Sequence, residues 1–430
     1  MDAAALVLGL TNDGWRALLL PLLDPEKSVR DAALSKLEEA LKESRGGRTD
    51  LWLDPDDMQR LVEIGMTVQF PSTSRTWKSP AHDILFWFVT IKHASLAKTI
   101  AVHYAVADDA ARLDAITILA AQRNEDALRT LGSLIELHGL PTRMYSRFFW
   151  ELNDSFQFAD CLMPQLVLRA GRYMPNVMDF INVAYQRGTL SPEKLVPAVS
   201  LVEEKASELL KTVRRRQRKN DGTLWRFAEE YIPPSHSLGA FLDLLSLIPG
   251  SSIDTLQKAK TLSDPRLRAI VAAGLLKRGV DPPAEIVRTA AASHVVRADL
   301  YRALAGLGRL DLFPVEHLSF EAFAASHFAS WLAYPSELGY EPEVLQLEAT
   351  LRGATGEGQR QWCLWKFKDA DGVAFAGVSG PYEMEPRLGP LEGSDAFSNF
   401  AEWDSATPEQ HLESVLATLQ DWRLHRAEDP

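Results

Sequence analysis

Apolar residues recur at intervals of three and four positions along most of the chain, from Asp13 to about Leu310. This spacing places them on one side of an α-helix, and the alternation that is typical of strands is absent from the region. Glycine and proline interrupt the pattern at intervals that predict antiparallel helix pairs with short connections. The interruptions lie at Gly46-Gly47, Pro71, Gly139-Leu140-Pro141, Gly171, Gly188, Pro233-Pro234, Pro249-Gly250, Gly279 and Pro282-Pro283.

Two segments of this region have similar sequences, LLDPEKSVRDAALSKLEEAL at Leu22–Leu41 and LSDPRLRAIVAAGLLKRG at Leu262–Gly279. In both, an Asp-Pro pair is followed by an apolar residue, an arginine and an apolar face. Aspartate caps the amino terminus of a helix and proline fits its first turn. The small residues on the apolar face allow a neighbouring helix to approach closely. The predicted faces consist of Ala32, Ala33 and Leu37, and of Ala272, Ala273 and Leu276.

These segments resemble the second helix of a HEAT repeat, in which an Asp-Pro turn precedes Val-Arg and a face rich in alanine and leucine. The resemblance implies an α-solenoid, in which stacked helix pairs share a continuous core and present a concave binding face. The alternative is an irregular helical bundle with one or two HEAT-like hairpins. WLAYPSELG at 331–339 and AGVSGPY at 376–382 are similar to the tails of bacterial HEAT-repeat proteins of unassigned function.

The pattern changes near Phe313-Pro314, beyond which one more helix is predicted over residues 316–331. Alternating apolar residues and intervening turns then predict a short antiparallel sheet. A final helix is predicted over Glu409–His425, with Thr407 as its cap. The predicted strands are Val344–Leu351, Gln361–Lys368 and Val373–Ser379.

The sequence therefore predicts a mainly α fold with two domains. Residues 1–314 form the HEAT-like solenoid of stacked helix pairs, and residues 315–430 form a small α+β domain.

The negative charge of the chain is concentrated in the second predicted domain. Residues 315–430 contain 20 Asp and Glu but 7 Lys and Arg, a net charge of −13, whereas residues 1–314 carry +1. An acidic surface repels nucleic acid and attracts basic partners, although many acidic surfaces only increase solubility.

The sequence predicts a cytoplasmic protein. Cys161 and Cys363 are its only cysteines, too few for a disulfide framework, which favours a reducing compartment. The amino terminus has no basic residue before its apolar run, so no secretory signal is expected. Lys92 and Lys98 interrupt the most apolar stretch, Ile84–Val106, so we expect a buried core helix there and no membrane span.

The segment Tyr382–Asp404 is the first candidate partner-binding site. It is rich in carboxylates, and its prolines and glycines predict a long surface loop. Such loops are often functional, although an acidic loop can also be merely solvated. The candidate residues are Glu383, Glu385, Glu392, Asp395, Glu402 and Asp404.

The second candidate site is an anion-binding run, KTVRRRQRKN at 211–220. Such a run can contact the phosphates of nucleic acid. Alternatively, it is the carboxyl end of a helix, where cations suit the dipole and can pair with the preceding Glu203, Glu204 and Glu208. The candidate residues are Arg214, Arg215, Arg216 and Arg218.

No catalytic residue, metal site or cofactor is predicted. The ten histidines lack the spacing of metal ligands, and no phosphate-binding glycine motif is present. GVSGPY at 377–382 lacks the second glycine of a nucleophile elbow, and Cys161 lies in an apolar context.

We therefore expect a non-catalytic scaffold that binds a basic protein, such as an immunity or inhibitor protein that neutralises a toxin or nuclease. The alternative is a HEAT-like nucleic-acid-binding protein or a DNA glycosylase for alkylated bases. A glycosylase needs a cationic face and a carboxylate near the extruded nucleotide, whereas the predicted solenoid is almost neutral.

Overall fold

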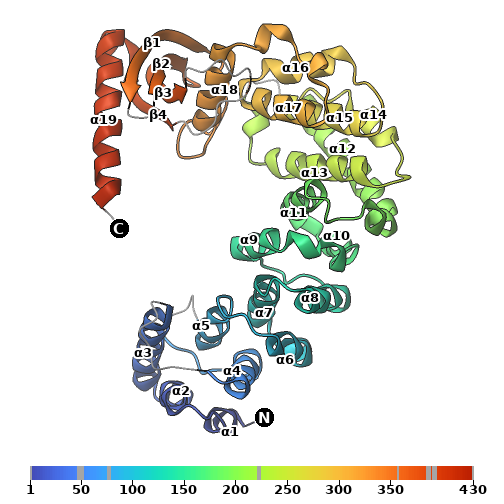
Figure 1. Ribbon diagram of the computed structural model, residues 1–430, viewed down its shortest axis with the longest axis vertical. Helices are drawn as coiled ribbons and strands as arrows, with labels where there is room; N and C mark the ends of the chain where they lie inside the picture. The colour runs from blue at the N-terminus through green and yellow to red at the C-terminus, as the bar shows by residue number, and fades with distance from the viewer. Residues whose placement is uncertain are drawn as a thin grey trace. The chain divides into compact units, whose positions relative to one another are not determined.

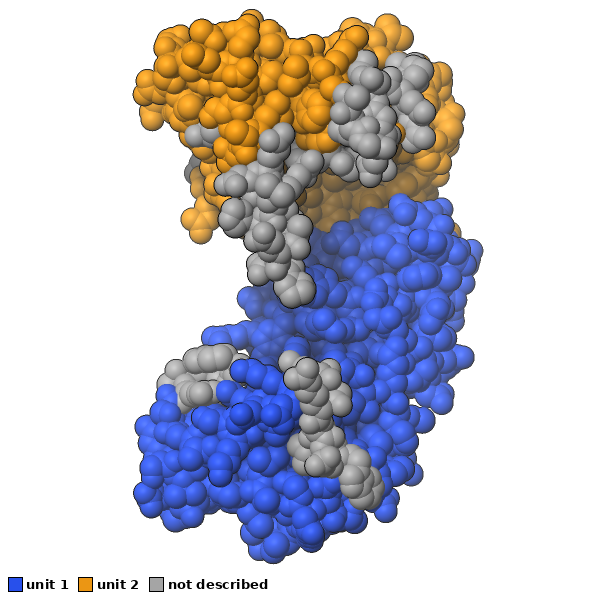
Figure 2. Space-filling view, turned by 60° about the vertical axis from the view of Figure 1, so that its left-hand side comes forward, with its two compact units in different colours: residues 1–201 blue, residues 202–430 orange. Residues whose placement is uncertain are grey.

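The computed structural model describes residues 2–45, 53–74, 79–219, 224–355, 358–383, 389 and 395–428. The chain is mainly α-helical, with a four-stranded antiparallel sheet near its carboxyl terminus (Figure 1). This confirms the predicted mainly α class with a small α+β module. The chain divides into two compact units, residues 1–201 and 202–430 (Figure 2). The boundary predicted between residues 314 and 315 lies inside the second unit.

The first unit consists of short helices joined by turns and single 3-10 turns. Its α-helices are α1 (Ala3–Leu8), α2 (Asp13–Leu19), α3 (Lys27–Arg45), α4 (Pro55–Thr67), α5 (Pro80–Trp87), α6 (Ser95–His103), α7 (Asp109–Ala121), α8 (Glu125–His138), α9 (Ser146–Asp154), α10 (Gln165–Arg169) and α11 (Met174–Gln186). The 3-10 turns are η1 (Leu20–Leu23), η2 (Tyr104–Val106), η3 (Phe156–Cys161), η4 (Gly171–Tyr173) and η5 (Pro192–Ala198).

Most helices of the first unit stack in two rows, as Figure 1 shows. In the first row, α3, α5, α7, α9 and α11 pack against one another in chain order. In the second row, α4, α6, α8 and α10 do the same, and α4–α5 and α7–α8 contacts join the rows. Helix α7 lies in the interior, where Leu113, Ile116 and Leu119 are buried. Each helix therefore buries its apolar residues mainly against its neighbours.

Many of these helices have a polar residue at the N-cap, the position just before the first helical residue. A side-chain oxygen at the N-cap accepts a hydrogen bond from a first-turn amide, which compensates for the missing intrahelical acceptor. Pro55 and Pro80 occupy the first helical position, where no amide hydrogen is needed. The capping residues are Asn12 for α2, Asp54 for α4, Ser79 for α5, Asp108 for α7 and Asn124 for α8.

The apolar stretch Ile84–Val106 is not one core helix, so that prediction is wrong. Helix α5 ends at Trp87 and α6 begins at Ser95. Between them, the His93 amide donates to Gln122 Oε1 on the neighbouring segment at 2.8 Å, which holds the intervening turn. In the described part of the chain, no helix is long and apolar enough to cross a membrane.

The two HEAT-like segments form helices with most of the predicted buried face. Asp264 caps α15 through the amides of Arg266 and Leu267, and Pro265 is its first residue. In α3, Ala33 and Leu37 are buried as predicted. Ala32 is exposed, because the buried stripe of α3 continues through Leu34 instead. In α15, Ala272 and Ala273 are buried, and Leu276 is half-buried against a neighbouring cluster.

The second unit begins within the long helix α12 (Val199–Lys219). Its helices continue with α13 (Ile232–Leu247), α14 (Asp254–Ala259), α15 (Pro265–Lys277), α16 (Ala284–Ala292), α17 (His294–Gly306) and α18 (Phe320–Leu332), and with the 3-10 turns η6 (Trp225–Phe227), η7 (Leu310–Leu312) and η8 (Val315–His317). Helix α13 packs on α15, and α15 to α18 pack in sequence.

A network of buried charged groups joins the helices of this unit. The Glu341 carboxylate accepts from Ser293 Oγ at 3.0 Å and from the His294 amide at 2.6 Å, so it caps α17 from a segment 47 residues away. Arg226 lies 3.3 Å from the same carboxylate. Arg297, only 3% exposed, donates to Ala291 O and Ala322 O and thereby links α16 to α18.

The sheet consists of β1 (Leu345–Thr355), β2 (Gly358–Lys368), β3 (Ala374–Glu383) and β4 (Asp395–Glu402), in that spatial order. It lies between α18 on one face and α19 (Pro408–Glu428) on the other (Figure 1). The alternation predicted for β2 is confirmed. Cys363, Trp365 and Phe367 pack in the cluster that includes α18, whereas Leu364 packs with Val415 of α19. The predicted cap of α19 is also confirmed, since Thr407 Oγ1 accepts from the Gln410 amide.

A glycine in β3 allows α18 to pack tightly on the sheet. A Cβ atom on Gly377 would lie 2.2 Å from Phe328 Cζ, far inside van der Waals contact. The Phe328 ring stacks on Trp365 with centroids 6.2 Å apart. Glycine at this position therefore sets how closely the helix approaches the strands.

Leu37 tests the assigned core of the first unit. Its side chain is 0% exposed in α3. Leu37→Asp places an unpaired carboxylate in that core, and we expect a loss of about 3 kcal/mol or more of unfolding free energy, or insolubility. Thermal unfolding checks this, with Ala32→Asp as control because Ala32 is exposed on the same helix. Equal melting temperatures for the two variants would contradict the assigned face.

Glu341 tests the buried network of the second unit. Glu341→Gln removes the charge that compensates Arg226 and lies near Arg297. Breaking a buried ion pair by removing one partner costs about 3–5 kcal/mol. Urea unfolding should show a loss of this size, whereas Glu343→Gln, at an exposed position two residues away, should change stability little. A similar small effect for both variants would mean that the network contributes little.

Candidate functional site

The carboxyl-terminal half of α12 places four cations on one side of the helix. Lys211, Arg214, Arg215 and Arg218 line a surface cavity of about 410 Å³. Their spacing of three, four and seven residues brings them onto one face of a helix. We call these four residues the cation stripe. Three of them, Arg214, Arg215 and Arg218, are candidates predicted from the sequence, and Lys211 joins them through the same helical spacing.

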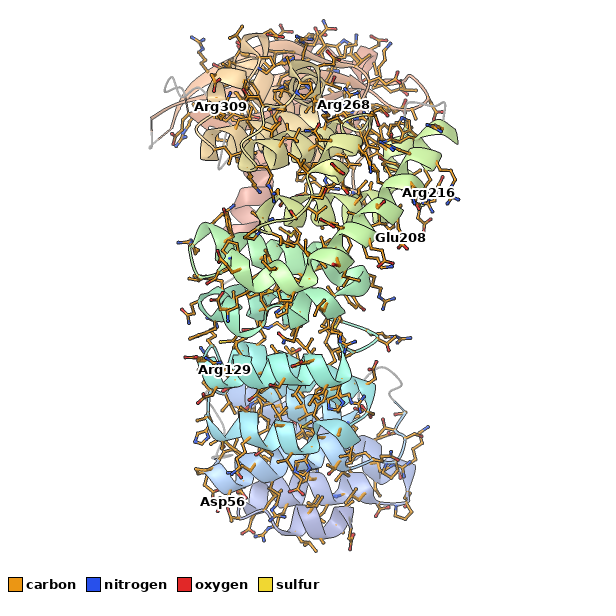
Figure 3. The ribbon with its side chains drawn as sticks, turned by 90° about the vertical axis from the view of Figure 1, so that its right-hand side faces the viewer. Asp56, Arg129, Glu208, Arg216, Arg268 and Arg309 are labelled. Atoms are coloured by element: carbon orange, nitrogen blue, oxygen red, sulfur yellow. The ribbon has the colours of Figure 1, made fainter. Side chains whose placement is uncertain are left out.

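Arg216, the remaining predicted cation, is not part of this cavity lining. At about 100° per residue, its side chain leaves the helix on the side away from the stripe. Figure 3 labels Arg216 and Glu208 on α12. The structure therefore brings together Arg214, Arg215 and Arg218 and separates Arg216 from them.

Arg214 is fixed in place by a second element. Its guanidinium donates to the Lys258 carbonyl oxygen and to Thr261 Oγ1, at 2.9 Å from the latter. Lys258 lies in the last turn of α14 and Thr261 in the turn that follows it, so the cavity wall is joined to the segment before α15. The sequence gives no local signal for this contact, which spans more than 40 residues.

The acidic residues that precede the stripe do not pair with it. Lys205 Nζ binds Glu208 at 2.9 Å, and Glu203 Oε1 accepts from the Ser252 amide at 2.6 Å. Within the described ranges, no carboxylate lies within ion-pair distance of the stripe. The alternative prediction, in which the stripe pairs with the preceding carboxylates of its own helix, is therefore wrong.

The predicted acidic site does not form one cluster among its described members. Glu383 ends β3, where its carboxylate lies 3.0 Å from Arg360 of β2. In the antiparallel pairing of β3 with β4, Asp395 is opposite Gly380 while Glu402 is opposite Phe375. Asp395 and Glu402 therefore lie at opposite ends of β4. Glu385 and Glu392 lie outside the described residues.

The prediction of one long loop over Tyr382–Asp404 is wrong at both ends. Its first two residues belong to β3, and Asp395–Glu402 form β4, which pairs with β3. The prolines and glycines of this segment favoured a loop prediction over a strand prediction. Strand β4 is stabilised by its backbone hydrogen bonds to β3, which no local sequence pattern predicts.

Glu402 and Asp404 have two acidic neighbours that are not among the residues predicted for this site. Both are exposed, and the exposed Glu409 and Glu413 follow in the first turns of α19. We call these four residues the acidic surface. Among the described residues, no cation lies within ion-pair distance of them. A carboxylate at a helix amino terminus is favoured by the helix dipole, which accounts for Glu409 locally.

Trp403 anchors the segment that carries this acidic surface. Its ring stacks on His411 with centroids 5.4 Å apart, and its carbonyl oxygen lies 2.8 Å from His411 Nε2. The Lys366 ammonium lies 5.0 Å from the centre of the same ring. The aromatic contacts therefore fix the backbone between Glu402 and Asp404 against the sheet and α19.

A buried ionisable pair lies in the first unit, where no site was predicted. His82 Nδ1 lies 2.8 Å from Asp114 Oδ2, and Asp114 is fully buried in α7. Burial raises the pKa of Asp114, while the contact with His82 opposes that rise. The His82 ring also packs near Tyr145 and Phe86. Residues 32 positions apart form this pair, so only the packing of α5 on α7 reveals it.

The remaining reactive side chains sit in structural positions. Ser379 of the GVSGPY stretch is 1% exposed within β3, where its hydroxyl accepts from Trp365 Nε1 at 2.8 Å. Burial raises the pKa of Cys161, and raises that of Cys363 to about 12, which disfavours both thiolates. Across the described ranges, no group of three or more His, Cys, Asp or Glu could hold a metal ion.

Comparison of this chain with protein families, with curated proteins and with solved structures finds no match.

The Asp114 carboxyl predicts a pH dependence of stability. In the unfolded chain, the Asp114 carboxyl is exposed and loses its proton near pH 4. In the folded chain, burial raises its pKa, so the carboxyl keeps its proton to a higher pH. The stability that this group contributes therefore falls as the pH rises above about 4. Asp114→Asn removes that loss and retains an oxygen that can accept from His82. Relative to the native chain, the variant should gain stability as the pH rises above about 4 in urea unfolding. A difference that is constant with pH would contradict the burial of an ionisable carboxyl.

Proposed function

We propose that this protein is a HEAT-like α-solenoid scaffold that binds another protein and performs no catalysis. The observation that carries the proposal is the two-row stack of helices in the first unit. Helix pairs that share a core along a row leave one side of each row free for a partner. The Asp-Pro turns and alanine-rich faces of α3 and α15 support the same repeat relationship.

Exposed aromatic side chains on the first row support a binding role. Trp150 of α9 is 61% exposed, and Tyr145 at the start of α9 is 39% exposed. Large aromatic residues contribute disproportionately to the binding energy of protein interfaces. Burial of the Trp150 ring against a partner would remove its apolar area from water, which is favourable.

The partner that we propose is a basic protein. The support is the net charge of −13 over residues 315–430 and the acidic surface, whose carboxylates have no cation within ion-pair distance among the described residues. Carboxylates that are not neutralised within their own chain attract cations over roughly a Debye length, which accelerates association. An inhibitor or immunity protein that covers the phosphate-binding face of a toxin or nuclease would use this chemistry.

Affinity capture from the source cell tests the proposed partner class. The immobilised chain should retain a basic protein at about 50 mM salt and release more of it at about 300 mM salt. The electrostatic proposal would be contradicted if no basic protein were recovered, or if the amount retained did not change with salt concentration.

Neutralising the acidic surface tests where that partner binds. The variant E402Q/D404N/E409Q/E413Q should bind the captured partner with an on-rate roughly tenfold lower and with a flatter salt dependence, because steering by charge is lost. Stopped-flow or surface-based kinetics would measure both quantities. A matched control changes the net charge equally through exposed carboxylates of the first unit, E39Q/E43Q/E136Q/E193Q. Equal slowing by both variants would show that net charge, and not this surface, governs association.

A further inference from the structure

The cation stripe on α12 has the features of a site built for a phosphate chain. Lys211, Arg215 and Arg218 are exposed, and they border one cavity of about 410 Å³ together with Arg214. Like charges four residues apart on a helix repel each other by a few tenths of a kcal/mol. The carboxyl end of the helix dipole offsets part of this repulsion, but a bound anion would remove more of it.

The stripe is held on a rigid frame. Arg214 is hydrogen-bonded to Lys258 O and Thr261 Oγ1. On the same helix, Gln217 donates to Tyr231 Oη at 3.1 Å, and Tyr231 donates to the buried Asp264 at 2.8 Å. These contacts fix the rotation of the helix about its axis. The three exposed cations therefore face solvent in a set orientation, which lowers the entropy lost when they bind a ligand.

The dimensions of the stripe match a run of phosphates. Lys211 and Arg218 are separated by seven residues, or about 10 Å along the helix axis. Each strand of a duplex presents one phosphate about every 3.4 Å along its axis, so the stripe can contact about three. No aromatic residue is among the lining residues that the structure describes. The described lining therefore offers charge for backbone phosphates and no aromatic platform for unpaired bases.

We propose that the cation stripe binds the phosphate backbone of a nucleic-acid duplex without regard to base sequence. Lys211, Arg215 and Arg218 contact phosphates directly, and Arg214 holds the cavity wall against the turn that contains Thr261. Guanidinium groups suit this role because their paired donors match phosphate oxygens. The site goes beyond the protein-binding proposal, since it lies on α12 and not on the acidic surface. The failure of either proposal leaves the other standing.

Fluorescence anisotropy with a labelled DNA duplex tests this site in the full chain. The native protein should bind, with a logarithmic salt slope of about −2.7 for three phosphate contacts. R215Q/R218Q should flatten that slope by about 1.8. Its affinity should fall by roughly eightfold per lost contact at about 0.1 M salt. Two duplexes of unrelated sequence should bind equally.

The matched control is R288Q/R302Q, two exposed arginines of the same unit that are paired with Glu285 and Asp299. It removes the same charge and should leave the slope and the affinity unchanged. Thermal unfolding of each variant verifies that it is folded. The proposal is overturned if the native chain does not bind at low salt, or if both double variants lose affinity equally. Equal binding of poly-glutamate, which would indicate an acidic protein ligand, would overturn it as well.

Discussion

The architecture of the first unit depends on one constraint, which is that no single helix there can bury its apolar stripe alone. Helices of 5 to 19 residues have too little surface to form a core in isolation. Each helix therefore depends on the neighbouring helices of its row to cover its apolar side chains. Helix α7 shows the consequence, since Leu113, Ile116 and Leu119 are all covered by adjacent helices. Trp150 of α9 is an exception to this burial, because its side chain stays exposed.

In the second unit, hydrogen bonds from buried charged side chains also hold the helices together. Arg297 satisfies carbonyl oxygens of α16 and α18, and Glu341 caps α17 from the segment before the sheet. Buried charges are costly unless they are compensated, and here each has defined hydrogen-bond partners. The small sheet then gains a core on each face, from α18 through Phe328 and from α19 through Val415. The sheet and the helices of this unit are therefore mutually dependent.

The two charged surfaces differ in how they are held. The cation stripe belongs to a single helix and gains its rigidity from Arg214 and Gln217, which contact neighbouring elements. The acidic surface extends from the end of β4 to the first turns of α19, and Trp403 fixes its centre. Both lie in the second unit, and among the described residues neither has an opposite charge within ion-pair distance. The proposed basic protein and the proposed nucleic-acid duplex would therefore use different elements of this unit.

Features that depend on a few neighbouring residues are predictable from the sequence alone. Helix caps such as Asp264 and Thr407, the alternation of β2 and the spacing of the cation stripe all follow from residues a few positions apart. Which of these elements contact one another is known from the folded chain and not from any local pattern. Strand β4 forms because β3 offers it an unpaired edge, and the His82–Asp114 pair forms because α5 packs on α7. Such pairings depend on backbone hydrogen bonds and shared apolar contacts between distant segments, which leave no periodic pattern along the chain.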